Sequence, residues 1–459
     1  MKKTMRRKFG VVVAGVIALA VVFAPYQSPQ AQNRNSSSII RDSEIESYFK
    51  EWSAPLLDAA QIPAGSVNVI LVQSNELNAF VAGGANIFFY TGLIEKTDGP
   101  GELMGVFAHE LGHIAGSHLI STRDAFERAS YESILGAVIG LGAAVLSGNG
   151  GAATSIISGS QSIAQRKLLS HTRVNESSAD QAALSYFESA KYNPSGLASF
   201  LGKLQDQELL PTSRQAEYVR THPLTRDRIN AVSNRAEKSP YFDKDFPASW
   251  EDQHTRMRAK LIGFISPGRV AWEYDDRDVS IPAQYARTIA AYRENRIEEA
   301  ISGIDALIAV EKDNPYFHEL KGQMLVDFSR LQEALSPYRK AIELKPQEAL
   351  FRIAYAHALI ESGDDEQNLN EAIEQLQRAE KRERRSGRVH RLLATAHGRL
   401  GQENLAKVHL AEEAVLQRRL PYAEQLAQAV LSNEPAQSAT WVKARDLLDY
   451  IKTLKPIEN

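Results

Sequence analysis

The alternation of apolar and polar residues predicts a mixed N-terminal region. Five apolar residues recur at helical spacing near its start: Ile40, Ile45, Phe49, Trp52 and Leu56. "SVNVILVQS" then alternates as a strand does, and "NAFVAGGANIFFYTGLI", broken at two glycines, predicts a hairpin or two short strands. "GELMGVFAHELGHIAGSHLIS" carries an apolar stripe typical of a strong helix. Strands followed by helices predict an α+β domain over residues 32–236.

A long uncharged stretch rich in glycine lies between Glu132 and Arg166. Its apolar part, Ile134 to Leu146, is too short to span a bilayer, and its glycines weaken a rigid helix. Residues 136–160 are therefore either a buried hairpin of helices with a glycine-rich turn, a mobile lid over a cleft, or a segment that touches a membrane peripherally.

The pattern changes beyond residue 282, where short phrases recur. Ala300, Ala334, Ala372 and Ala406 are spaced by 34, 38 and 34 residues, and the four extra residues fit "DDEQ" in a turn. One unit matches the tetratricopeptide pattern at five positions: Gly322, Ala334, Tyr338, Ala341 and Pro346. We therefore expect an all-α superhelix with a concave groove over residues 283–459, ending in a capping helix near 440–452, with 237–282 as connector.

Length, charge and composition narrow the class of protein. A chain of 459 residues needs at least two domains, and a net charge of −3 argues against a nucleic-acid surface spread over the protein. The absence of cysteine excludes disulfides, thiolate zinc sites and a cysteine-linked lipid anchor. A basic start, an uncharged run from Phe9 to Ala24 and a polar end predict a signal peptide at residues 1–31 and export to the periplasm, with an uncleaved membrane anchor as the alternative.

"HELGH" is the strongest chemical signal in the chain. His109 and His113 are four residues apart, so on a helix both imidazoles project from one face and can bind one Zn²⁺. Glu110 lies about 100° around the helix from His109, where it can reach an activated water as general base. This arrangement indicates metal-assisted hydrolysis of a peptide bond.

A catalytic zinc site needs a third protein ligand, and the sequence offers two candidates. His118 requires a bend at Gly116 to approach the other histidines. "RVNESSADQAAL" offers Glu176 on a later helix, with Asp180 on the same face to accept the ring N–H of a ligand histidine and orient it.

These motifs resemble the membrane-associated zinc peptidases of the CAAX-prenyl-protease and HtpX family, most closely its periplasmic members with repeats. The likeness rests on "HELGH", "NESSAD", the stretch before the zinc helix and "HPLTRDRI", and covers roughly residues 40–235. It implies a mostly helical, gluzincin-like domain with a small β-sheet. It also implies His109, His113 and Glu176 as zinc ligands and Glu110 as the base.

The resemblance further implies an endopeptidase that degrades misfolded or stalled envelope and outer-membrane proteins, with chaperone-like repeats that contact the outer-membrane assembly machinery. His222, in "HPLTRDRI", is either structural or a fourth ligand that displaces the catalytic water and keeps the enzyme latent. The alternative function is a tetratricopeptide scaffold or chaperone with a latent or inactive zinc site. The strand near residues 87–90 is either an exposed edge that aligns substrate or a fully paired core strand.

Overall fold

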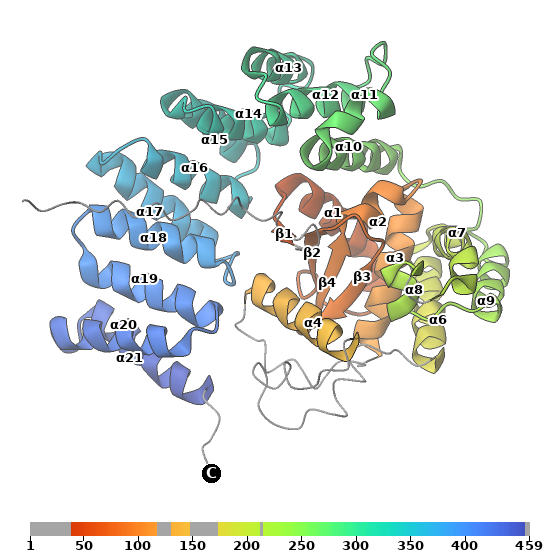
Figure 1. Ribbon diagram of the computed structural model, residues 1–459, viewed down its shortest axis with the longest axis horizontal. Helices are drawn as coiled ribbons and strands as arrows, with labels where there is room; N and C mark the ends of the chain where they lie inside the picture. Colours follow the sequence, from red (N-terminus) through yellow and green to blue (C-terminus); the bar gives the residue numbers. More distant parts are fainter. Residues whose placement is uncertain (1–37, 117–129, 147–172, 212–213, 455–459) are drawn as a thin grey trace, which may run out of the picture. The chain divides into compact units, whose positions relative to one another are not determined.

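A computed structural model describes residues 38–116, 130–146, 173–211 and 214–454 (Figure 1). The predicted signal peptide, His118 and residues 147–160 of the glycine-rich segment lie outside the described residues. Within the described ranges, each helix is too short or too polar to cross a membrane.

The N-terminal part contains a four-stranded sheet. Its strands are β1 (Ser38–Ile40), β2 (Asn68–Gln73), β3 (Ala79–Ala82) and β4 (Asn86–Tyr90). Their order in the sheet is β1-β2-β4-β3, with β2 and β4 parallel and the other two pairs antiparallel. β3 and β4 form the predicted hairpin, whose turn uses Gly83 and Gly84 at positive φ of 62° and 95°.

The strand order decides between the two alternatives for residues 87–90. β4 contains residues 87–90, pairs with a strand on each side and is buried along its whole length, so it is a core strand and not an exposed edge. The edge strand next to it is β3. A short run of aromatic and β-branched residues locates a strand but does not reveal its place in the sheet, which explains why the sequence left both possibilities open.

Helices surround this sheet. They are α1 (Ser43–Ala59), α2 (Thr91–Lys96), α3 (Pro100–Ala115), α4 (Tyr131–Leu146), α6 (Arg173–Ala190), α7 (Ser195–Lys203), the 3₁₀ helix η4 (Gln205–Leu209), α8 (Glu217–Thr221) and α9 (Arg226–Glu237). The Asp42 side chain caps α1 by accepting a hydrogen bond from the Ile45 amide, and Pro100 begins α3.

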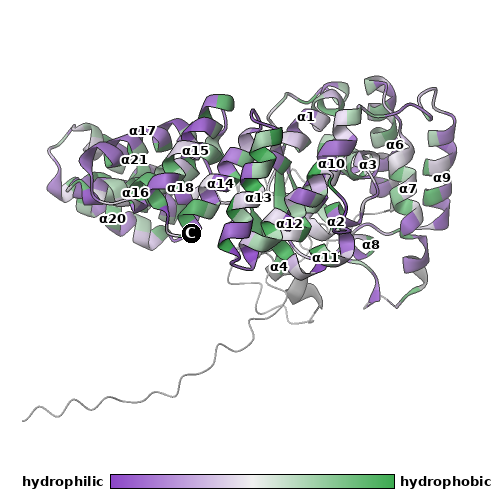
Figure 2. Cartoon of the chain, turned by 90° about the horizontal axis from the view of Figure 1, so that it is seen from above, coloured by the Kyte–Doolittle hydropathy of each residue, from purple (hydrophilic) through white to green (hydrophobic). Residues whose placement is uncertain are grey.

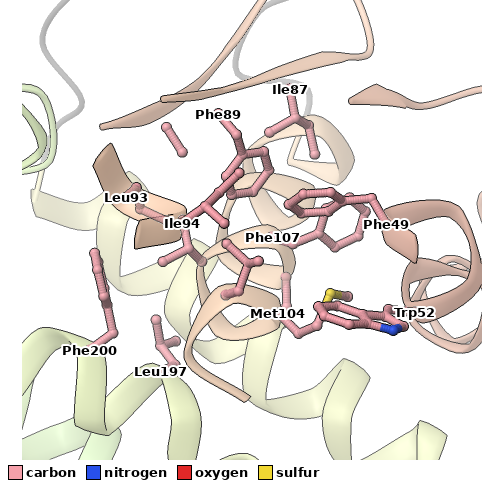
Figure 3. Packing of buried hydrophobic residues seen from close by; sticks show 14 of the residues in the cluster. Phe49, Trp52, Ile87, Phe89, Leu93, Ile94, Met104, Phe107, Leu197 and Phe200 are labelled. Carbon is pink, nitrogen blue, oxygen red and sulfur yellow. The ribbon is translucent and has the colours of Figure 1, made fainter. Parts of the chain in front are cut away.

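The core lies on both faces of the sheet. On one face, Phe49 of α1, Phe89 of β4 and Phe107 of α3 are fully buried and pack together, with the Phe49 and Phe89 ring centroids 4.9 Å apart (Figure 3). On the other face, α4 contributes Ile134 and Leu135 to a separate buried cluster with the strands. The first part of the glycine-rich segment is therefore a helix that covers the sheet.

The remaining described chain is helical. Its elements are α10 (Ala248–Ile265), the 3₁₀ helix η6 (Pro267–Arg269), α11 (Val270–Glu273), α12 (Ile281–Arg293), α13 (Ile297–Val310), α14 (Pro315–Asp327), α15 (Leu331–Leu344), α16 (Ala349–Glu361), α17 (Glu366–Glu380), α18 (Gly387–Arg399), α19 (Glu403–Leu416), α20 (Leu420–Asn433) and α21 (Ala439–Leu454). The predicted α+β domain followed by an all-helical repeat region is thereby confirmed. The segment expected to be a connector, 237–282, holds the 18-residue helix α10.

The recurring residues of the repeats are explained by packing. Ala300, Ala334 and Ala372 are fully buried, whereas Ala406, in the loosest of the recurring phrases, is only partly buried. A Cβ added at Gly322 would meet the Tyr338 ring at 2.8 Å, so α14 and α15 approach closely only with glycine there. Figure 2 shows that hydrophobic and hydrophilic residues mix along these helices, as expected when each helix buries one face.

Buried polar contacts join the N-terminal part to the helices that follow. Lys260 of α10 is buried, and its Nζ lies 3.1 Å from Glu44 Oε2 at the start of α1. The hydroxyl of Tyr285 on α12 donates to the same oxygen at 2.9 Å. Arg41 donates to Glu383, after α17, at 2.6 and 2.8 Å. The residues that lead into α1 are therefore held by three later parts of the chain.

Gly112 sets the distance between α3 and α6. An added Cβ would lie 2.8 Å from the backbone oxygen of Ala179 and 2.9 Å from its Cα. Gly112→Ala should push α6 away and lower the free energy of unfolding by about 1–3 kcal/mol in urea denaturation. Gly136→Ala in α4 is the matched control, because its Cβ would meet nothing within 4 Å. Equal effects of the two substitutions would contradict this account.

Candidate metal centre

Two helices bring the predicted ligands together. His109 and His113 lie on α3, Glu176 lies on α6, and all three side chains are fully buried. The His109 Nε2 atom is 3.1 Å from His113 Nε2 and 3.4 Å from Glu176 Oε2. His113 Nε2 is 3.5 Å from Glu176 Oε1. The spacing of four positions between the two histidines on α3 and the close approach of α6 at Gly112 produce this convergence.

The donor set fits zinc. With Zn–N and Zn–O bonds of about 2.0–2.2 Å, the ligand atoms of a tetrahedral site lie about 3.3–3.5 Å apart. The three distances above come close to this value, and two imidazoles with one carboxylate are a ligand combination found in catalytic zinc sites. The distances of Glu176 from both histidines suit a third ligand. The competing candidate, His118, lies outside the described residues.

Asp180 holds the ring of His109 in place. Its Oδ1 atom lies 2.9 Å from His109 Nδ1, on the side of the ring away from the other ligands. A hydrogen on Nδ1 leaves the Nε2 lone pair available for a metal, which is the arrangement that orients ligand histidines in metal sites. The predicted pairing of Asp180 with a ligand histidine is therefore present in the structure.

Arg228 of α9 was missed by the sequence analysis. Its Nε and Nη2 atoms donate to Asp180 at 2.5 and 2.9 Å, and its Nη1 lies 2.9 Å from Glu176 Oε2. Nη1 also donates to the Pro223 carbonyl at 3.2 Å, next to His222. One buried guanidinium thus joins the α6 carboxylates to the loop. The sequence feature that could have indicated Arg228 is its position inside "HPLTRDRI". Its partners, however, become clear only from the fold.

The carboxylates of this centre stay ionised. Burial raises the pKa of Asp180, but hydrogen bonds with Arg228 and His109 outweigh it and bring that pKa to about 2. Burial likewise raises the pKa of Glu176, and the opposing effects of His222, His109 and Arg228 bring it to about 2. Burial lowers the pKa of His109, but its contacts with Asp180 and Glu176 raise it to about 9. The centre therefore favours positive charge.

His222 lies against the same centre. It is fully buried, and one of its ring nitrogens lies with an atom each of His109, His113 and Glu176 in a group of four potential ligand atoms within 4.8 Å of one another. Its Nδ1 lies 2.9 Å from Thr221 Oγ1, and its ring stacks on Tyr218 at 4.5 Å between centroids. The contacts with Thr221 and Tyr218 therefore hold the His222 ring where it can serve as a fourth donor.

Glu110 faces this loop. Both of its carboxylate oxygens are buried and accept no hydrogen bond from the described residues, and Oε1 lies 3.3 Å from His222 Nε2. A buried carboxylate beside the ligand atoms is suited to take a proton from a water molecule there.

Comparisons with known proteins agree with this geometry. The profile of peptidase family M48 matches residues 41–236, and a tetratricopeptide repeat profile matches residues 282–451. The chain has a peptidase M48 domain followed by tetratricopeptide repeats. The predicted resemblance is therefore confirmed, and the M48 domain contains the whole centre described above.

Relatives extend the likeness to nearly the full chain. The chain is 24% identical over 432 residues to the beta-barrel assembly-enhancing protease of Escherichia coli (strain K12), covering 92% of this chain and 86% of the relative. It is 23% identical over 341 residues to the protein of that name from Yersinia pestis, covering 72% and 68%. A solved structure, "MamA MSR-1 C2", aligns with 37% of this chain and 95% of its own at 20% identity, but its TM-score of 0.31 is too low to support an argument.

Arg228 provides a test of the charge balance in the M48 domain. Arg228→Gln should lower the free energy of unfolding of metal-free protein by about 3–5 kcal/mol in urea denaturation, because Glu176 and Asp180 lose their shared counter-charge. Added zinc should recover part of this loss by supplying positive charge. Arg235→Gln is the control, since Arg235 also lies on α9 and contacts α6, but it is partly exposed and contacts Gln181 and Glu188 there. Losses of similar size in both variants would refute the assignment.

Proposed function

We propose that this protein is a zinc-dependent endopeptidase in which His109, His113 and Glu176 hold the ion. The observation that carries the proposal is the convergence of two imidazoles and one carboxylate at distances that fit a tetrahedral site. A metallopeptidase of family M48 needs such a centre. In this proposal Asp180 orients His109, and Glu110 is the catalytic base.

The chemistry divides between the ion and Glu110. When bound, zinc supplies Lewis acidity that activates water at the site. Glu110 takes the proton from the attacking water and later passes it to the leaving amine nitrogen. Burial of Glu110 excludes bulk water, which favours transfer of the proton to the substrate over its loss to solvent.

Substrate alignment is proposed for β3, the edge strand. An extended peptide that adds to the outer edge of β3 would gain main-chain hydrogen bonds without requiring a particular side-chain sequence. The loop with His222 borders this strand: the Tyr218 amide donates to Leu77 O at 2.9 Å, and Thr221 Oγ1 donates to Asn78 Oδ1 at 3.3 Å. A peptide on β3 would therefore lie next to this loop.

The proposed substrates are misfolded or stalled envelope proteins, in particular outer-membrane proteins. Support comes from the relatives named beta-barrel assembly-enhancing protease, which imply a protein of the cell envelope. We propose a periplasmic location, reached through a signal peptide at residues 1–31, and a repeat region that contacts substrates or the outer-membrane assembly machinery. Repeat helix pairs stacked in series provide an extended surface for such contacts.

A second function also has structural support. His222 near the three proposed ligands would complete a four-donor site and displace the catalytic water, which leaves the centre latent. In that case the chain acts as a repeat scaffold or chaperone, and hydrolysis requires release of the His222 loop.

Glu110→Gln separates the two functions. It should lower the rate of peptide hydrolysis by about 10²–10⁴-fold, because an amide cannot accept the proton from water. Zinc content and binding to substrate proteins should stay unchanged, since Glu110 is not a proposed ligand. Hydrolysis of an unfolded outer-membrane protein, followed by gel analysis alongside zinc determination, provides the measurement. Hydrolysis at the wild-type rate would exclude Glu110 as the base.

His222→Ala tests latency. If His222 is a fourth donor, its removal opens a coordination position for water and raises peptidase activity several-fold in the same assay. His318→Ala is the control, because His318 is an exposed histidine in the repeats whose Nε2 contacts only a backbone carbonyl among the hydrogen bonds of the described chain. Activity of His222→Ala equal to or below that of wild type would contradict the latent state.

A further inference from the structure

A second cluster of potential ligands lies in the repeat region, between α18 and α19. His390 and His397 lie on α18, two turns apart, and His409 lies on α19. The His409 ring is stacked between the other two, with ring centroids 5.8 Å from His390 and 5.5 Å from His397. All three rings are buried. Neither the peptidase proposal nor the packing of the repeat signature requires histidines here.

Three ligand atoms converge within this cluster. Glu412, one turn after His409, places Oε2 3.0 Å from His390 Nδ1 and 2.9 Å from His409 Nδ1. The two Nδ1 atoms are 3.5 Å apart. The edge between the two Nδ1 atoms matches the spacing of about 3.3–3.5 Å between ligand atoms that metal bonds of about 2.0–2.2 Å produce, and the two edges to Glu412 are shorter. Two imidazoles and one carboxylate repeat the donor set of the M48 centre.

Hydrogen bonds from both histidines to Glu412 would explain only part of this geometry. Glu412 can accept from both Nδ1–H groups, but two such groups directed at one oxygen gain nothing from approaching each other to 3.5 Å. A cation bound by all three atoms brings the two Nδ1 atoms together and accounts for their separation of 3.5 Å, whereas the distances of 2.9 and 3.0 Å to Glu412 also fit N–H···O hydrogen bonds.

A fourth potential donor lies close to this triangle of ligand atoms. Glu380, the last residue of α17, has Oε1 3.8 Å from His390 Nδ1. It lines a hollow of about 460 Å³ together with His409 and three basic side chains: Lys381, Arg384 and Lys443. These basic side chains oppose an uncompensated cation but favour an anionic group beside it, so a carboxylate is the expected fourth ligand.

We propose that His390, His409 and Glu412 form a second metal site, which binds a divalent transition ion such as Zn²⁺ and uses Glu380 as the fourth ligand. Imidazole and carboxylate donors suit zinc and its neighbours more than magnesium or calcium. The ion links α18 to α19 and reaches the end of α17, so it stabilises this part of the repeat stack. The site does not depend on the proposed peptidase function.

Metal content of the full chain tests the proposal. Chelator-treated protein, titrated with Zn²⁺ and measured by elemental analysis after removal of free ion, should hold about two ions per chain. Glu412→Gln should hold one, because the amide keeps the shape and a hydrogen-bond acceptor but loses the anionic donor. His397→Gln is the matched control and should hold two: His397 stacks on the same ring, but its Nδ1 contacts Gln402 and not the triangle.

A second variant keeps the test independent of folding in the repeats. His109→Ala with His113→Ala removes the M48 centre alone, so this protein should still hold one ion and show cobalt absorption bands after Co²⁺ substitution. If it holds none, or if folded Glu412→Gln holds as many ions as wild type, the second site does not exist and the cluster is a hydrogen-bonded one. If wild-type protein holds a single ion that Glu412→Gln loses and the double variant keeps, the M48 centre binds no ion, which counts against the proposed function and leaves the second site standing.

Discussion

The close packing of α3 against α6 at Gly112 is the constraint on which the centre depends. Two histidines one turn apart define only one side of a site, and the other side comes from a helix about sixty residues later in the chain. The backbone of Ala179 fills the space that any larger residue at position 112 would need. Because Glu176 and Asp180 flank Ala179 on α6, the distance between the helices also fixes the distance between the ligand atoms.

Charge balance is the second requirement of this buried arrangement. Two carboxylates on α6 are removed from water and remain ionised only because Arg228 and the histidines lie against them. The guanidinium comes from α9, beyond the loop with His222, and also binds the carbonyl of Pro223. The same side chain therefore neutralises the centre and anchors the loop that faces it.

The sequence predicted what depends on local spacing. Helical periodicity was enough to place His109 with His113 and Glu176 with Asp180, and the recurring alanines located the repeats, because each pattern is contained in one or two neighbouring helices. The role of Arg228 could not be predicted, because it depends on contacts that join α9 to α6 and to the loop with His222. The strand order could not be predicted from local pattern either: β3 and β4 are both short apolar runs, yet β4 is central and β3 is the edge. The triangle of His390, His409 and Glu412 needed the stacking of two helices before it became visible.

The contact between the Tyr218 amide and the Leu77 carbonyl has a consequence for recognition. Leu77 lies two residues before the edge strand β3, and its carbonyl already accepts a hydrogen bond from the segment that leads to His222. In the proposed alignment, a polypeptide that extends its pairing past the beginning of β3 would compete with the Tyr218 amide for that carbonyl. Binding of a long extended segment on β3 would then be linked to movement of the segment that carries His222.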